Sequence, residues 1–316
     1  MKLKAVIKIV ISVVMLALVL RFVNLRSLGH SLLAIPTSTM ILFLVIFTAG
    51  QLLSSFKWWI IARSGGVDVP WSTAVRAYFI GMFVNCFGFG TVGGDFARGI
   101  LLADGKKVKT IALASVIADR AQGLAVLSLI ALISVAIFGQ PLLDARLVYI
   151  LLATLFAVIA VWFIAPSIIF RLVPDNSKIG SILRHIFQVF PRSPGTVAAI
   201  TLISAVFHFS QIGLHGMILH SLGADVSWPV LLTTIPFVNI LATLPLSWNG
   251  LGVRENSYVF FLYPAFITRD QAVALGAIWL IMLAIASSIG GILSVLTKDF
   301  DIEAAEKELE TAPSHD

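Results

Sequence analysis

Three short segments combine glycine, arginine and carboxylate residues within an otherwise apolar chain. They read "GGDFAR" (93–98), "ADRAQ" (118–122) and "NGLGVRE" (249–255). An arginine side chain presents a planar fork of N–H donors that matches a phosphate or carboxylate group. Glycine lets the backbone turn and approach a ligand closely. The three segments therefore predict a site for an oxyanion such as a lipid phosphate.

The candidate headgroup-binding residues are the charged members of these segments and two asparagines at matching places upstream: Arg98, Arg254, Arg120, Asp95, Asp119, Glu255, Asn85 and Asn239. We expect Asp95 and Glu255 to orient arginines rather than touch the ligand. The asparagines can instead cap broken helices. The expected backbone turns are at Gly93, Gly94, Gly250 and Gly252. The alternative is a structural ion-pair network that ties these segments to the helix containing Asp119 and Arg120.

Other chemistries have little support in the residues. His208, Gln211 and His215 share one helix face, but a metal site needs a further ligand, so we expect hydrogen bonding between helices. The chain contains no Walker, GxSxG, HExxH or CxxC motif, and Cys86 is its single cysteine. We therefore predict no catalytic residue, no metal and no cofactor.

The composition is that of a polytopic membrane protein. Of 316 residues, 59% are hydrophobic and 12% are charged, about half the charged fraction of a soluble domain. The formal net charge of +6 comes mostly from short loops and the N-terminus. Such charge indicates membrane topology and contact with anionic lipid rather than nucleic acid.

The apolar runs predict an all-α fold with six spanning helices, near 5–23, 38–61, 111–138, 147–170, 196–220 and 271–297. Two further runs, 71–94 and 229–253, end in glycine-rich segments, and each is followed by an apolar remnant too short to span. If both dip into the membrane and return, most loop bases fall on the cytoplasmic side with both termini. We therefore predict two re-entrant hairpins in one membrane domain (1–298), followed by an acidic cytoplasmic tail (299–316), in the plasma membrane.

Short matches in the same order indicate an internal repeat. "GVDVPW" (66–71) returns as "GADVSW" (223–228), "FVN" (83–85) as "FVN" (237–239), and "GGDFAR" (93–98) as "NGLGVR" (249–254). The predicted halves, about 38–138 and 196–297, have opposite orientations because three crossings separate the start of one leading helix from the start of the other. Inverted repeats with broken helices are a transporter architecture whose site lies between the repeats. We therefore expect Arg98 and Arg254 to lie on opposite sides of one cavity and to have similar effects when replaced.

The motifs "GTVGGDFARGILL", "ASVIADRAQGL" and "PLSWNGLGVREN", in this order, resemble the lysylphosphatidylglycerol synthase transmembrane region, also called the flippase-like integral membrane family. The resemblance covers about residues 5–297. It implies a lipid-translocating membrane domain, which some members fuse to a soluble aminoacyl-lipid synthetase. Here only a short acidic tail follows Lys298, so a separate lipid-modifying enzyme is a possible partner. The second motif has "SWNG" where a glycine-rich version is more usual.

The sequence thus favours a standalone flippase-like transporter that moves an anionic or polyprenyl-linked lipid headgroup across the bilayer and is not an enzyme. Two alternatives stay open. One is a membrane-embedded transferase acting on a lipid-linked donor, for which Asp95, Asp119 or Glu255 could serve as a base. The other is a non-transporting membrane subunit.

Overall fold

The computed structural model describes residues 35–88, 90–103, 109–138, 144–173, 177–243, 250 and 252–297. These residues form helices and connecting turns, with no strand among them. The helices are α3 (Thr37–Ser64), α4 (Trp71–Phe87), α5 (Gly90–Ala103), α6 (Lys109–Phe138), α7 (Ala145–Ile159), the π-helix η1 (Ala160–Ile164), α8 (Ala165–Leu172), α9 (Lys178–Phe187), α10 (Pro194–Ser221), α11 (Trp228–Thr243), α12 (Val253–Leu262) and α13 (Arg269–Thr297).

Five segments of the described chain are long and apolar enough to cross a membrane. They are α3, α6, the continuous run from α7 through η1 to α8, α10 and α13. Each corresponds to one of the predicted apolar runs. The sixth predicted run, 5–23, and the acidic tail, 299–316, lie outside the described residues. The all-α membrane class is therefore confirmed for the part of the chain that the structure describes.

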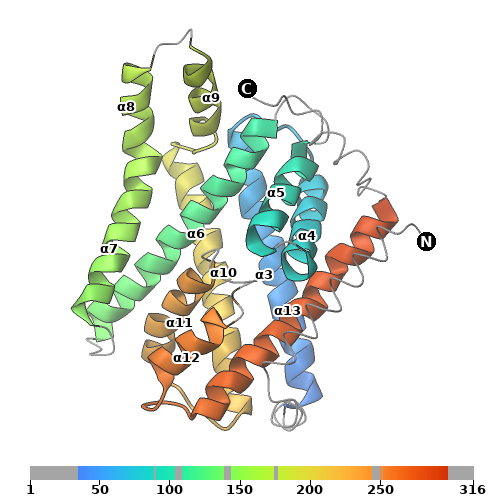
Figure 1. Ribbon diagram of the computed structural model, residues 1–316, viewed down its shortest axis with the longest axis vertical. Coiled ribbons are helices and arrows are strands. Elements are labelled where there is room, and N and C mark those ends of the chain that lie inside the picture. The colour runs from blue at the N-terminus through green and yellow to red at the C-terminus, as the bar shows by residue number, and fades with distance from the viewer. Residues whose placement is uncertain are drawn as a thin grey trace, which may run out of the picture.

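Four shorter helices form two antiparallel pairs, α4 with α5 and α11 with α12. α4 and α5 have 17 and 14 residues, and α11 and α12 have 16 and 10. Figure 1 shows the α4–α5 pair in the upper half of the view and the α11–α12 pair in the lower half. α4 packs against α5 and α13, whereas α11 packs against α6 and α12.

Close contact between α4 and α5 depends on glycine. A Cβ atom on Gly94 would collide with the Gly81 carbonyl oxygen and the Asn85 side chain of α4. Gly93 and Gly94 were expected at a backbone turn, but both lie inside α5, and the chain reverses direction around Gly88 instead. The correction has a physical reason, because glycine here removes a side chain between two helices rather than permitting a bend.

The second hairpin uses glycine in the way that the sequence predicts. Gly250 and Gly252 lie between α11 and α12 with φ angles of 78° and 77°, a conformation that side-chain-bearing residues rarely adopt. Gly252 also precedes the first residue of α12 as its N-cap. The turn therefore requires glycine for its backbone angles.

A third glycine contact joins α13 to the first hairpin. A Cβ atom on Gly290 would collide with the Phe79 carbonyl oxygen in the middle of α4, whereas one on the adjacent Gly291 would meet only the Phe83 ring, at 2.7 Å. The two glycines thus face different parts of α4, one its backbone and the other a side chain.

Helix boundaries recur along the chain with a constant offset. α3 and α10 have 28 residues each, and both their starts and their ends are 157 positions apart. α4 and α11 begin at Trp71 and Trp228, at the same offset. Gly66 and Gly223, which precede them, both have positive φ angles, of 94° and 75°. The first of the short sequence matches, 66–71 with 223–228, therefore falls on corresponding helix junctions.

Candidate functional site

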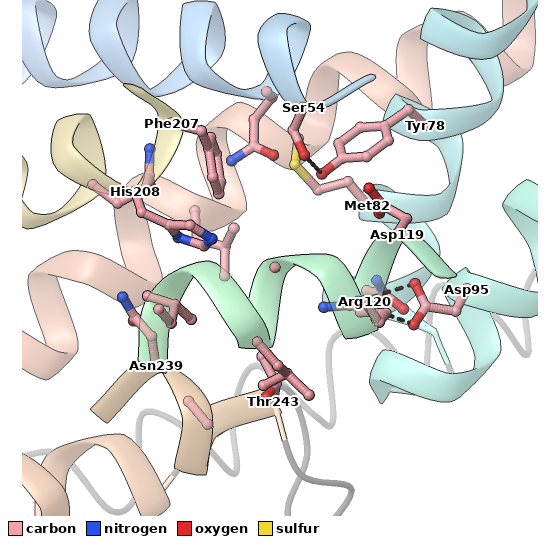
Figure 2. Close-up of a pocket in the computed structure, with 18 of the residues that line it drawn as sticks. Ser54, Tyr78, Met82, Asp95, Asp119, Arg120, Phe207, His208, Asn239 and Thr243 are labelled. Atoms are coloured by element: carbon pink, nitrogen blue, oxygen red, sulfur yellow. Dashed lines mark hydrogen bonds and ion pairs between the residues drawn. The ribbon is translucent and has the colours of Figure 1, made fainter. Parts of the chain in front are cut away.

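The central cavity lies where the two hairpins meet the long helices. It has a volume of about 400 Å³, and its lining comes from α3, α4, α5, α6, α10, α11, α12 and α13. Figure 2 shows Asp95 and Tyr78 on one side of it and Asn239 and Thr243 on the other. Seven of the eight candidate headgroup residues line it: Asn85, Asp95, Arg98, Asp119, Arg120, Asn239 and Arg254. The sequence therefore identified groups that the fold brings to one place.

The charged groups on the first side form a continuous ion-pair chain, in the order Arg120, Asp95, Arg98, Asp119 and Lys57. Both guanidinium nitrogens of the Arg120 fork donate to the Asp95 carboxylate, at 2.8 and 2.9 Å. Asp95 also accepts from Arg98 Nε at 3.2 Å, and Arg98 Nη2 reaches Asp119 at 3.1 Å. The last member, Lys57, has its ammonium 3.0 Å from the other Asp119 oxygen.

This ion-pair chain ties three segments together. Lys57 lies on α3, Asp95 and Arg98 on α5, and Asp119 and Arg120 on α6. The ion-pair network expected as the structural alternative is therefore present for the segments 93–98 and 118–122, but among the described residues it does not include Arg254 or Glu255. The ion-pair chain has a formal charge of plus one, because it contains three cations and two carboxylates.

Arg98 is the most enclosed arginine of the ion-pair chain. It is 4% exposed, and its guanidinium carbon lies 4.9 Å from the centre of the Trp58 ring and 5.1 Å from that of Tyr78. Hydrogen bonds hold both rings in place: Trp58 Nε1 donates to Ser115, and the Tyr78 hydroxyl donates to Ser54. Cation–π contacts of this desolvated kind are worth about 2 kcal/mol.

Lys57 is a site residue that the motifs missed. It lies inside the predicted span 38–61, in "SSFKWWII", and is 4% exposed. Besides Asp119, it donates to the Gln122 side-chain oxygen at 3.0 Å. The available signal was the lysine itself, since a charge at membrane depth is costly unless it is paired or functional.

The second side of the central cavity carries a less constrained arginine. Arg254 is half-buried, and its guanidinium carbon lies 5.4 Å from the centre of the Trp279 ring. Among the described residues no carboxylate is within ion-pair distance of it. Glu255 does not line the central cavity: its carboxylate accepts from the Gly252 backbone N–H at 2.6 Å and caps α12.

The histidine face of α10 divides into two roles. His215 is fully buried and stacks on Trp279 of α13. Its Nε2 atom forms a 2.7 Å hydrogen bond with the Tyr258 hydroxyl of α12, which confirms hydrogen bonding between helices for this residue. His208 and Gln211 line the central cavity, and the Nε2 atom of each is buried without a hydrogen-bond partner. The described part of the chain contains no group of three or more His, Cys, Asp or Glu residues that could hold a metal ion.

Neither asparagine caps the start of a helix. Asn85 lies in the last turn of α4, and Asn239 lies inside α11, so N-cap geometry is not available to either. Both face the central cavity. The capping interpretation was therefore wrong, because the helices extend beyond these residues.

With histidine neutral, the charges that line the central cavity do not cancel. The described lining contains four cations, Lys57, Arg98, Arg120 and Arg254, against two carboxylates. The formal surplus is thus two positive charges. Apolar side chains such as Phe47, Phe207 and Leu283 complete the wall. The cavity can therefore attract an anionic group while its apolar part accommodates hydrocarbon.

A comparison with protein-family models matches residues 5–296 to the lysylphosphatidylglycerol synthase TM region. The match covers the same part of the chain as the resemblance carried by the three motifs. A comparison with curated proteins gave no match.

Proposed function

Since the chain belongs to the family of the lysylphosphatidylglycerol synthase TM region, we propose that it is a lipid transporter of the flippase type. It would move an anionic or polyprenyl-linked lipid headgroup through the central cavity, in the plasma membrane, without covalent chemistry. The observation that carries the proposal is the lining of that cavity, which combines a surplus of two cations with apolar side chains. A lipid has the same two-part character, with a polar head and hydrocarbon chains.

The geometry of the two hairpins supports this function. Their four helices are about 15 to 26 Å long at 1.5 Å per residue, less than the roughly 30 Å of a bilayer core. We propose that both hairpins are re-entrant and related by an inverted repeat. Each would then enter the membrane from its own side and meet the other at the central cavity, as in transporters that alternate access around a fixed site.

Cysteine labelling tests this topology. In a variant with Cys86 replaced by serine, single cysteines at positions 107 and 178 should react with a membrane-impermeant reagent from the cytoplasmic side. A cysteine at Asp225, in the turn between α10 and α11, should react from outside, because three crossings separate it from position 107. Labelling of position 107 from outside would mean that the first hairpin crosses the membrane, and the repeats would then be parallel.

Reconstituted vesicles test the activity. Purified protein should redistribute a fluorescent anionic phospholipid between leaflets without ATP, down its own gradient or an ion gradient. Protein-free vesicles are the control. No new lipid species should form when phospholipids are mixed with aminoacyl or sugar donors. A covalent lipid product that depends on Asp119 would instead favour the transferase, and an unchanged lipid distribution would favour the non-transporting subunit.

A further inference from the structure

The contacts in the central cavity distinguish its arginines, and they bear on which headgroup it accepts. We propose that the cavity selects a net-anionic phosphate headgroup that carries no ammonium group. In this assignment Arg254 binds the phosphate, and the ion-pair chain supplies a positive field rather than a direct contact. The inference rests on the proposed function and narrows its substrate class.

The arginines of the ion-pair chain already use their forks on carboxylates. Arg120 binds Asp95 through both nitrogens of its fork, at 2.8 and 2.9 Å. Arg98 divides its donors between Asp95 and Asp119 and lies between two aromatic rings. A phosphate could bind either fork only by displacing a carboxylate. Displacement would leave a carboxylate unpaired, and for the buried Asp119 this is strongly unfavourable.

Arg254 has the opposite character. No carboxylate pairs with it in the described chain, since its neighbour Glu255 caps α12. It lies over the neutral Trp279 ring and faces the same cavity. Its other side-chain partner in the described chain is the neutral Tyr258 hydroxyl, so N–H donors of the guanidinium remain that a phosphate oxygen can accept from. It is therefore the cation that a headgroup phosphate can reach without breaking an ion pair.

Two unpartnered polar atoms nearby indicate that the central cavity is built for a polar ligand. His208 is 8% exposed and Gln211 is 5% exposed, and the Nε2 atom of each is buried without a partner. Figure 2 shows the His208 ring directed into the cavity. Gln211 Nε2 can donate a hydrogen bond, and an ionised phosphate or a hydroxyl oxygen can accept it. Buried polar atoms of this kind are normally satisfied, so a bound headgroup accounts for them.

The charge surplus decides against zwitterionic heads. A phosphodiester head without an amine carries one negative charge and is attracted by the surplus of two positive charges in the lining. Phosphatidylcholine and phosphatidylethanolamine have no net charge, and their ammonium groups would meet Lys57, Arg98 and Arg120. Like charges juxtaposed in a partly desolvated site give strong discrimination against the wrong partner.

The test measures translocation of three acyl-labelled fluorescent lipids, phosphatidylglycerol, phosphatidylcholine and phosphatidylethanolamine, in the same proteoliposomes. We expect phosphatidylglycerol to move about tenfold faster than either zwitterion, because only the zwitterions bring an ammonium group against the cations of the lining. Arg254→Gln and Lys57→Met each reduce the surplus by one charge and should lower this ratio severalfold. Lys57→Met combined with Asp119→Asn keeps the surplus at two and should retain the ratio, whatever happens to the absolute rate.

A matched control lies outside the central cavity. Asp225 is exposed and pairs with His220, so Asp225→Asn should change neither the rates nor the ratio. Arg254→Gln breaks no carboxylate pair and so keeps the test decisive if Lys57→Met does not fold. No movement of any lipid by the wild-type protein would refute the proposed function itself. Equal movement of all three lipids would leave transport standing and overturn the charge selection. An unchanged rate of phosphatidylglycerol translocation in Arg254→Gln would overturn the phosphate assignment, because all three lipids carry the phosphate that Arg254 is proposed to bind.

Discussion

Alanine in place of Arg98 is expected to lower the free energy of unfolding by about 3–5 kcal/mol, the cost of removing one partner from a buried ion pair. Arg98 is 4% exposed and links Asp95 to Asp119. Without it, Asp119 retains only Lys57, and the space between the Trp58 and Tyr78 rings is left empty. The loss therefore combines an electrostatic cost with a cavity.

The measurement is the melting temperature of purified protein in detergent, together with the yield of folded protein. Arg120→Ala is the matched control, because its side chain is 38% exposed although it also binds Asp95. Solvent screening should limit its effect to about 1 kcal/mol. Arg98→Lys keeps the charge but loses the fork, so an intermediate effect is expected. Equal shifts for the two alanine variants would contradict the role of burial, and no shift for Arg98→Ala would contradict the ion-pair chain as a structural element.

Alanine at Gly290 should destabilise the protein by about 3 kcal/mol or more, at or above the upper end for inserting one methyl group into a packed interior. The added Cβ atom would collide with the Phe79 carbonyl oxygen, which belongs to the backbone of α4 and cannot rotate away. α13 and α4 would have to separate. Because α4 is half of the first hairpin, the wall of the central cavity would be displaced as well.

Gly291→Ala is the matched comparison, because Gly291 is the next residue of α13. Its Cβ atom would meet the Phe83 ring at 2.7 Å, and a side chain can adopt another rotamer. Alanine also favours the helix over glycine by about 1 kcal/mol, which offsets part of the clash. We expect a melting temperature close to that of the wild type for Gly291→Ala and a large decrease for Gly290→Ala. Similar values for both variants would show that the backbone contact between α4 and α13 is not as close as described.

The spanning helices were predictable because each spans a bilayer-sized run with few charges, and five runs reappear as α3, α6, α7–α8, α10 and α13. The glycine roles were predictable only in part. A glycine cluster indicates positions that exclude a side chain, but it does not distinguish a backbone turn from close packing against a neighbouring helix. Gly250 has the positive φ angle of a turn, whereas Gly94 lies inside α5 against Gly81.

The charged residues of the site were identifiable by type, but their partners were not. Asp119 and Arg120 are neighbours in the chain and point about 100° apart on α6, so each finds its partner on another segment. Asp119 meets Lys57 and Arg98, while Arg120 meets Asp95. The repeat suggested equivalent roles for Arg98 and Arg254, which do face one cavity. Their partners differ because Glu255 caps α12 whereas Asp95 reaches α6.

The distribution of the ion-pair chain over α3, α5 and α6 also constrains how the protein is made. During synthesis α3 emerges first, and Lys57 then has neither Asp119 nor Gln122 to bind. A single charge at the centre of a membrane helix costs at least about 2.5 kcal/mol, and five uncompensated charges would cost on the order of 10 kcal/mol. We therefore expect α3, α5 and α6 to be stable in the bilayer only as a group, once α6 lies beside α3. Truncated chains that end before α6 would carry an unpaired lysine that cellular quality control can recognise.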